Sequence, residues 1–124
     1  MMKSQITLLA TIIIVSSPVV AFSNTENDQT GFSAQRGKEI WNEQFSTSSQ
    51  SRSCATCHTD DPRKPGKHAS TGKPIKPMAP SINANRLTDQ RKIEKWFKRN
   101  CKWTIGRECT DQEKGNVLEF LKNI

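Results

Sequence analysis

The chain has 124 residues, of which 33% are hydrophobic and 25% are charged, and its formal net charge at neutral pH is +7. This length accommodates one small domain with a modest core, so we expect covalent or cofactor-based reinforcement of the fold. The positive charge suits an acidic protein partner, and no nucleic-acid-binding motif accompanies it, which argues against DNA or RNA.

The first residues have the pattern of an export signal. Basic Lys3 precedes an apolar run from Leu8 to Val20, and the small residues Ala21 and Ser23 suit a cleavage site. We expect cleavage after Ser23, with Ala21 as second choice. An uncleaved anchor is the alternative, although the run is shorter than the roughly 18 residues of a spanning helix. The prediction is a signal peptide at 1–23 and one domain at 24–124, exported to an oxidising compartment that we take to be a bacterial periplasm.

The first helix is predicted from Ser33 to about Gln44. Ser33 is a favourable N-cap, and Ile40 and Trp41 contribute to an apolar side. Gly37 interrupts this helix at a cost of up to ~1 kcal/mol relative to alanine, and a glycine on the inner face allows another helix to approach closely. The polar segment 46–53 is predicted to be a loop.

The five residues Cys54-Ala55-Thr56-Cys57-His58 form a C-x-x-C-H motif, which indicates covalent attachment of a c-type haem. The two thiols add to the haem vinyl groups, and His58 supplies the proximal iron ligand. A redox dithiol would be expected within a βαβ pattern, which is absent from the sequence. Half of a zinc site would need a second Cys pair, and Cys101 and Cys109 do not have that spacing.

The segment from Thr59 to Pro80 holds five prolines and two glycines, which disfavour a helix or a central strand. A loop of this length without secondary structure is unusual unless it wraps something, and the edge of a haem is sufficient reason.

A second long helix is predicted from a cap at Thr88, with one stripe formed by Ile93, Trp96, Phe97 and Asn100. A short loop between Cys101 and Cys109 follows. Thr110 and Glu113 then form a capping box that opens the last helix, whose inner face is predicted to be Val117, Leu118 and Leu121, with Phe120 beside it. We therefore predict an all-α fold.

The distal iron ligand decides the function, because a strong ligand suits electron transfer whereas a weak one leaves room for small molecules. Met78 is one candidate, although an apolar contact with the haem edge is its alternative role. His68 has no apolar flank and is better interpreted as a surface residue. Asn100 ends the apolar stripe, and its alternative role is to terminate the helix. A disulfide between Cys101 and Cys109 would hold the backbone after Asn100 in place.

Several segments resemble the sphaeroides haem proteins, which are small exported monohaem cytochromes c with a class I fold. The resemblance covers about residues 36–121 and rests on the haem motif and on four further segments: Thr71-Gly72-Lys73, Ala79-Pro80-Ser81, Arg99-Asn100-Cys101 and Ile105-Gly106-Arg107-Glu108-Cys109-Thr110. It implies one covalent haem c, His58 and Asn100 as axial ligands, and a Cys101–Cys109 disulfide. It also implies that Asn100 detaches on reduction and that the ferrous protein binds oxygen and other diatomic ligands. Electrons would come from a dihaem cytochrome c linked to a b-type membrane cytochrome. Met78 departs from what we expect of some relatives and stays a possible competitor for the iron.

The first hypothesis is therefore a monomeric, redox-gated binder of small molecules, with electrons arriving at a haem edge near exposed lysines: Lys64, Lys67, Lys73 and Lys76. The second hypothesis is a plain periplasmic electron carrier in which Met78 is the permanent sixth ligand. The third is a reductase of small oxygen or nitrogen compounds, although no histidine or carboxylate is evidently placed to deliver protons.

Overall fold

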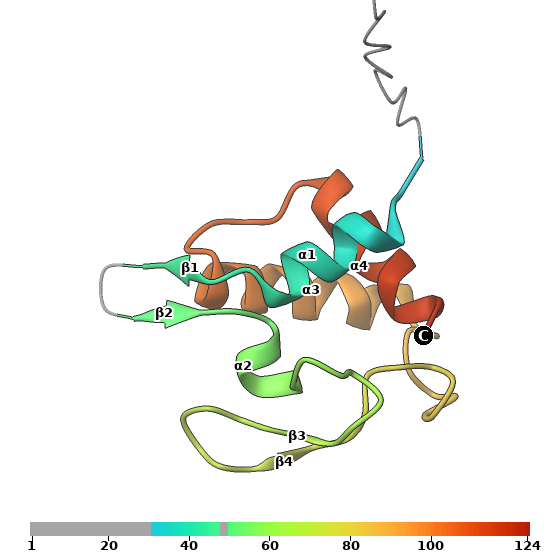
Figure 1. Ribbon diagram of the computed structural model, residues 1–124, viewed down its shortest axis with the longest axis horizontal. Helices are drawn as coiled ribbons and strands as arrows, with labels where there is room; N and C mark the ends of the chain where they lie inside the picture. Colours follow the sequence, from blue (N-terminus) through green and yellow to red (C-terminus); the bar gives the residue numbers. More distant parts are fainter. Residues whose placement is uncertain (1–30, 48–49) are drawn as a thin grey trace, which may run out of the picture.

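The computed structural model describes residues 31–47 and 50–124, within which the chain forms four helices and two short antiparallel ribbons. The elements follow in the order α1 (Ala34–Asn42), β1 (Phe45–Ser46), β2 (Ser51–Arg52), α2 (Ala55–His58), β3 (Gly66–Lys67), β4 (Pro74–Ile75), α3 (Gln90–Thr104) and α4 (Asp111–Lys122) (Figure 1). The predicted signal peptide lies outside the described residues. None of the described helices is long and apolar enough to span a membrane.

The all-α prediction needs a correction, because β1 pairs with β2 and β3 pairs with β4. The second ribbon lies inside the proline-rich segment, where Lys67 is opposite Pro74. Each strand has only two residues, which is too short for the alternating apolar pattern that reveals strands in a sequence. The fold is helical with two small ribbons.

Helices α1 and α4 lie side by side and form the closely packed centre of the molecule (Figure 1). Ser33 caps α1 through its side chain, as predicted, although the helix ends at Asn42 rather than near Gln44. Gly37 lies at the crossing, since a Cβ there would overlap the backbone carbonyl of Asn116 in α4. The prediction of a close helix approach at Gly37 is confirmed.

The core lies between these two helices and consists of five buried side chains: Ile40, Trp41, Val117, Phe120 and Leu121. Phe120 was expected beside the inner face, but it is buried within it, whereas Leu118 is only half-buried. Asn116 completes the junction by accepting a hydrogen bond from the backbone amide of Ser33 at 2.8 Å.

Helix α3 begins one residue later than predicted. Its N-cap is Asp89, whose carboxylate accepts hydrogen bonds from the amides of Arg91 and Lys92. Thr88 instead directs its hydroxyl to the carbonyl of Asn85. A carboxylate forms charge-assisted bonds with two free amides and also complements the helix dipole, so Asp89 is the stronger cap.

The far end of α3 also differs from the prediction, because the helix continues past Asn100 to Thr104. Gly106 has a φ of 86°, in the left-handed region, and its amide bonds to the carbonyl of Cys101 to terminate the helix. Asn100 therefore lies inside the helix rather than at its end.

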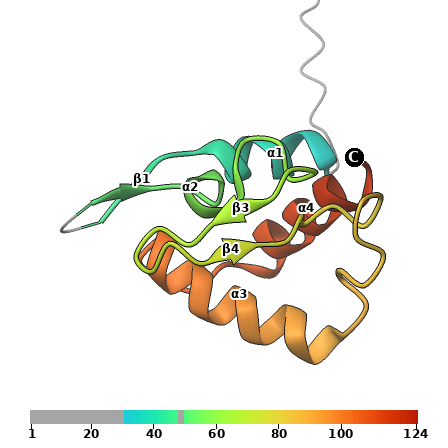
Figure 2. The same ribbon diagram turned by 90° about the horizontal axis from the view of Figure 1, so that it is seen from below.

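Helix α3 stands apart from the α1–α4 pair and, among the described residues, meets the other elements at few points (Figure 2). The β3–β4 ribbon and the loops around it run between α2 and α3 in this view. The haem motif and the stripe of α3 thus belong to different parts of the fold.

Candidate haem site

Most of the C-x-x-C-H motif forms a single short helix, α2, with Cys54 at its N-cap position. Ser53 is 2% exposed, and its hydroxyl accepts a hydrogen bond from the Thr56 amide, which starts this turn. Thr59 has a φ of 64° and ends the turn directly after His58. Both cysteines are free and half-buried. Burial raises the pKa of the Cys54 thiol to about 11, so this thiol is protonated at neutral pH.

Trp41 of α1 holds the histidine end of this turn. Its indole N–H donates to the Thr59 carbonyl at 2.8 Å, and the centre of its ring lies 5.5 Å from that of His58. The sequence placed Trp41 on the inner side of a helix, but it gave no sign of this contact. The partners are far apart in the chain, and neither has a local pattern that would pair them.

His58 has the chemical state that an iron ligand needs. Burial, followed by the positive charge of Arg86, lowers the pKa of His58 to about 4, so the imidazole is neutral at neutral pH. Its Nδ1 atom is buried and has no hydrogen-bond partner among the described residues. A buried imidazole nitrogen without a partner is costly, and a neutral ring that the protein's own hydrogen bonds leave uncommitted fits an iron ligand.

The surroundings of the motif also fit a large apolar group. Six side chains pack against the core but stay only partly buried: Cys54, Ala55, Met78, Leu87, Phe97 and Ile124. Cys54 and Ala55 belong to the motif, Met78 belongs to the proline-rich segment that the sequence predicted to wrap the haem edge, and Phe97 belongs to α3. On the same stripe of α3, Trp96 is 50% exposed. Apolar side chains that remain partly exposed next to free thiols and a neutral histidine fit a covalently attached macrocycle.

A zinc site is not supported by the geometry. Within the described ranges, no group of three or more His, Cys, Asp or Glu side chains is placed to hold a metal ion. Cys54 and Cys57 therefore lack the additional ligands of a tetrahedral site there.

The three candidate distal ligands differ in their surroundings. His68 is exposed, and its Nδ1 accepts hydrogen bonds from the amides of Ser70 and Thr71, so its ring is engaged within its own loop. Met78 is half-buried and packs against the core, as its alternative role as an apolar contact requires. Asn100 is exposed, and no hydrogen bond of its side chain occurs among the described residues.

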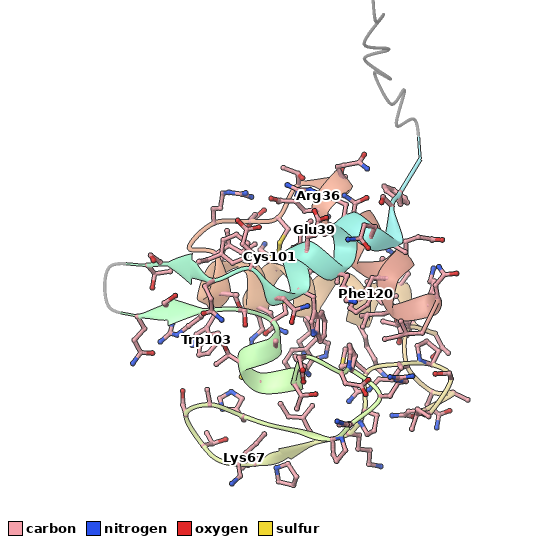
Figure 3. All side chains as sticks on the ribbon, viewed as in Figure 1. Arg36, Glu39, Lys67, Cys101, Trp103 and Phe120 are labelled. Atoms are coloured by element: carbon pink, nitrogen blue, oxygen red, sulfur yellow. A yellow bond between two sulfur atoms is a disulfide. The ribbon has the colours of Figure 1, made fainter. Side chains whose placement is uncertain are left out.

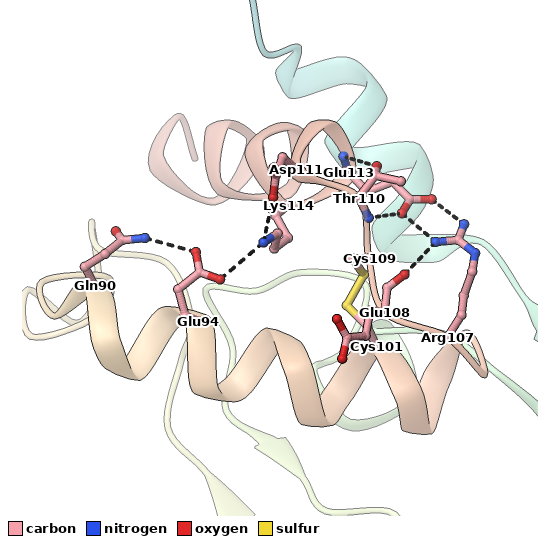
Figure 4. A network of polar contacts seen from close by, with 10 residues as sticks. All are labelled: Gln90, Glu94, Cys101, Arg107, Glu108, Cys109, Thr110, Asp111, Glu113 and Lys114. Carbon is pink, nitrogen blue, oxygen red and sulfur yellow. Dashed lines mark hydrogen bonds and ion pairs between the residues drawn. A yellow bond between two sulfur atoms is a disulfide. The ribbon is translucent and has the colours of Figure 1, made fainter.

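The backbone around Asn100 is firmly anchored. The next residue, Cys101, is buried and forms a disulfide with Cys109, with 5.6 Å between their Cα atoms (Figure 4). Arg107 and Glu113 form an ion pair of 2.7 Å beside it, and the predicted capping box of Thr110 and Glu113 is confirmed. The disulfide thus ties the last turns of α3 to the start of α4.

The β3–β4 ribbon lies directly against the motif. A Cβ at Gly66 would overlap the carbonyl of Cys57, and the Ala69 amide donates to the Cys57 sulfur at 3.3 Å. Four exposed lysines belong to this ribbon and the segments next to it: Lys64, Lys67, Lys73 and Lys76. No ion pair of these four lysines occurs within the described part of the chain, and Lys67 projects outward from the ribbon (Figure 3).

Known proteins identify the family. A family described as a domain of unknown function (DUF1924) matches residues 27–121. The cytochrome c-type protein SHP of Cereibacter sphaeroides is 42% identical over 89 residues, which cover 71% of this chain and 68% of SHP. Cytochrome c'' of Methylophilus methylotrophus is 41% identical over 86 residues, which cover 68% of this chain and 60% of that protein. The chain belongs to the cytochrome c''/SHP family.

Two solved structures from this family share the fold. Oxidised SHP, described as an oxygen-binding cytochrome c, superposes with a TM-score of 0.71 at 38% identity, covering 75% of this chain and 83% of that one. Oxidised cytochrome c'' superposes with a TM-score of 0.68 at 39% identity, covering 73% and 75%. The cytochrome c-like helical fold is therefore established. The protein is a c-type cytochrome with one covalently bound haem c, as the motif predicted.

Proposed function

We propose that this protein is an exported class I-like cytochrome c in which His58 and Asn100 are the axial ligands of the haem iron. In this proposal Asn100 leaves the iron on reduction, and the reduced protein binds small diatomic ligands such as oxygen or nitric oxide. Cys54 and Cys57 would carry the thioether links. When bound, the haem supplies the redox change and the coordination position at which ligands exchange.

The observation that carries the proposal is the state of the Asn100 amide. It is exposed, it has no hydrogen bond within the described residues, and it lies three residues after Phe97, which packs on the same core as Cys54. Residues three apart share one face of a helix, so the amide extends the face of α3 that meets this core. A neutral amide oxygen is a weak ligand for ferric iron and a weaker one for ferrous iron, so reduction favours its release.

A hydrogen bond and a disulfide would confine the movement on ligand release to the Asn100 side chain. The Trp41 hydrogen bond to Thr59 fixes the turn that bears His58. The Cys101–Cys109 disulfide anchors the backbone next to Asn100. With both ligand-bearing segments held, only the side chain of Asn100 needs to move when it detaches.

The descriptions of two solved relatives support a distal ligand that leaves the iron. SHP is described as an oxygen-binding cytochrome c. A solution structure of Methylophilus methylotrophus cytochrome c'', with a TM-score of 0.64 at 40% identity over 72% of this chain and 73% of that one, is described as giving insight into haem-ligand detachment. Both properties agree with a releasable distal ligand.

Delivery of electrons to a periplasmic protein is the second part of the proposal. A dihaem cytochrome c linked to a b-type membrane cytochrome is the proposed donor, on the basis of the family resemblance. The lysines around the β3–β4 ribbon would guide its docking, because they are exposed, belong to or flank the ribbon that packs against Cys57, and have no ion-pair partners among the described residues.

The main alternative is a plain electron carrier ligated by Met78, which is favoured by one observation, the packing of Met78 against the core that Cys54 also contacts. The variants Asn100→Ala and Met78→Leu separate the two functions. We expect Asn100→Ala to convert the ferric protein to a high-spin or water-ligated spectrum and Met78→Leu to leave the ferric spectrum unchanged. The opposite pattern would assign the iron to Met78 and make the protein an electron carrier.

A further inference from the structure

A polar contact joins the segment before the haem motif to the end of the helix that bears Asn100. Arg52 of β2 donates from Nη1 to the backbone carbonyl of Trp103 at 3.1 Å, across 51 positions of sequence. The Arg52 guanidinium also lies over the Trp103 ring, 4.0 Å from its centre. Both side chains are half-buried, and Trp103 lies at the level of β2 in Figure 3.

The carbonyl of Trp103 needs a partner of this kind. It lies in the last turn of α3, where carbonyls have no amide four residues on within the helix. The amides of Ile105 and Gly106 both go to the Cys101 carbonyl instead. A cation at this end also complements the negative pole of the helix dipole. Arg52 therefore caps the Trp103 carbonyl from outside the helix.

The guanidinium is held in place from its other side. Its Nε and Nη2 atoms both donate to the Gln50 side-chain oxygen, at 3.1 and 2.6 Å. This orients the planar group so that Nη1 reaches the Trp103 carbonyl. A lysine could supply the charge at this position but not the two-sided fork or the stacking geometry.

The contact between Arg52 and Trp103 connects the two segments that bear the haem motif and Asn100. Arg52 lies two residues before Cys54, and the intervening Ser53 is buried and bonded to Thr56 of α2. Trp103 lies three residues after Asn100 on the same helix. The disulfide ties this helix to α4, whereas the Arg52 contact ties it to the segment that leads into the haem motif.

We propose that Arg52 is a positioning residue that holds Asn100 within reach of the iron and so sets the ratio of iron-bound to released Asn100. By holding the last turn of α3 against the motif segment, it fixes the distance that the amide must span in the oxidised protein. It also limits detachment on reduction to the Asn100 side chain. This inference rests on the proposed function, because it assumes that Asn100 is the distal ligand.

The test uses the full-length holoprotein with the substitutions Arg52→Gln and Arg52→Lys. The matched control is Arg36→Gln, which removes an arginine ion pair with Glu39 that lies wholly within α1. Ferric visible spectra between 5 and about 40 °C give the ratio of Asn-released to Asn-bound protein, while far-ultraviolet circular dichroism follows folding. Amide hydrogen exchange at residues 103–106 reports directly on the end of the helix.

We expect Arg52→Gln to raise the ratio of released to bound protein about tenfold, the effect of losing one charge-assisted hydrogen bond. Arg52→Lys should give a smaller rise, because it keeps the charge but loses the fork. Both should speed amide exchange at residues 103–106, and Arg36→Gln should change neither quantity. If Arg52→Gln does not fold, the Arg52→Lys result decides alone.

The outcomes separate this inference from the proposed function. If Asn100→Ala changes the ferric spectrum but neither Arg52 variant does, the positioning role is overturned and the distal ligand stands. If the spectral change of the Arg52 variants follows the loss of helical signal, the role is general stabilisation and the inference is overturned. If Asn100→Ala leaves the ferric spectrum unchanged, both proposals are refuted.

Discussion

The crossing of α1 and α4 gives the sharpest test of the packing, through the substitution Gly37→Ala. A Cβ at this position would overlap the backbone carbonyl of Asn116 and also approach the Cβ of Phe120 at 2.8 Å. Backbone cannot rotate away as a side chain can, so the two helices must separate. This separation would loosen the core that Trp41 and Phe120 share.

The magnitude follows from two opposing effects. Overpacking a close contact costs about 1–3 kcal/mol or more, whereas alanine is favoured over glycine inside a helix by about 1 kcal/mol. Since the obstacle is backbone, we expect a net loss of about 2 kcal/mol in the free energy of unfolding. For a domain of this size, that corresponds to a fall in Tm of roughly 10 °C.

Gly115→Ala is the matched control, on the partner helix. The three atoms nearest to its Cβ would all belong to the ring of Phe32, a side chain that is 56% exposed and can swing outward. The gain in helix propensity should then offset the lost contact, and stability should change by less than about 1 kcal/mol. Thermal unfolding of the holoproteins, followed by circular dichroism, measures both variants. A Gly37→Ala protein as stable as the Gly115→Ala protein would refute the reasoning.

Three further substitutions test the site's supports. Arg107, which forms a hydrogen bond with Glu113, lowers the pKa of that carboxyl to about 2. The ionised carboxyl therefore stabilises the folded state fully above its unfolded pKa of 4.5, and this stabilisation is lost as the pH falls through 2. Glu113→Gln should therefore cost about 1 kcal/mol at pH 7, after allowance for solvent screening, and little near pH 2; a cost independent of pH would contradict this. Cys101→Ser should lower stability by about 2–3 kcal/mol through the opened loop to Cys109 and raise the high-spin ferric fraction; denaturation midpoints equal to wild type would contradict it. Met78→Leu should change stability by less than about 1.5 kcal/mol, because it keeps the volume of an apolar contact; a larger loss would indicate a more demanding role.

The sequence predicted those features whose cause is local. The C-x-x-C-H spacing, the Ser33 cap and the box of Thr110 and Glu113 each depend on residues within four positions of one another, and the helix starts that the two caps specify occur in the structure. The helix crossing at Gly37 was also predictable, because glycine in an otherwise regular helix has few other uses.

Features that depend on contacts between distant segments were missed or misplaced. Thr88 was predicted as the cap of α3, but Asp89 takes that position because its carboxylate accepts from two amides, directly after a turn at Leu87 with a φ of 58°. The ribbons were missed because their strands are too short to show a pattern. The contacts of Arg52 with Trp103 span 51 positions and have no counterpart in the local sequence.

The redox-gated account is tested most directly by the visible spectrum of the purified holoprotein, first ferric, then reduced with dithionite under argon, and then exposed to carbon monoxide. We expect a low-spin ferric spectrum, because His58 and Asn100 both hold the iron. We expect the reduced protein to become high-spin and to bind carbon monoxide at once, because Asn100 has left. A reduced protein that stays low-spin and does not react with carbon monoxide would contradict the account, since a strong and permanent sixth ligand would then be present.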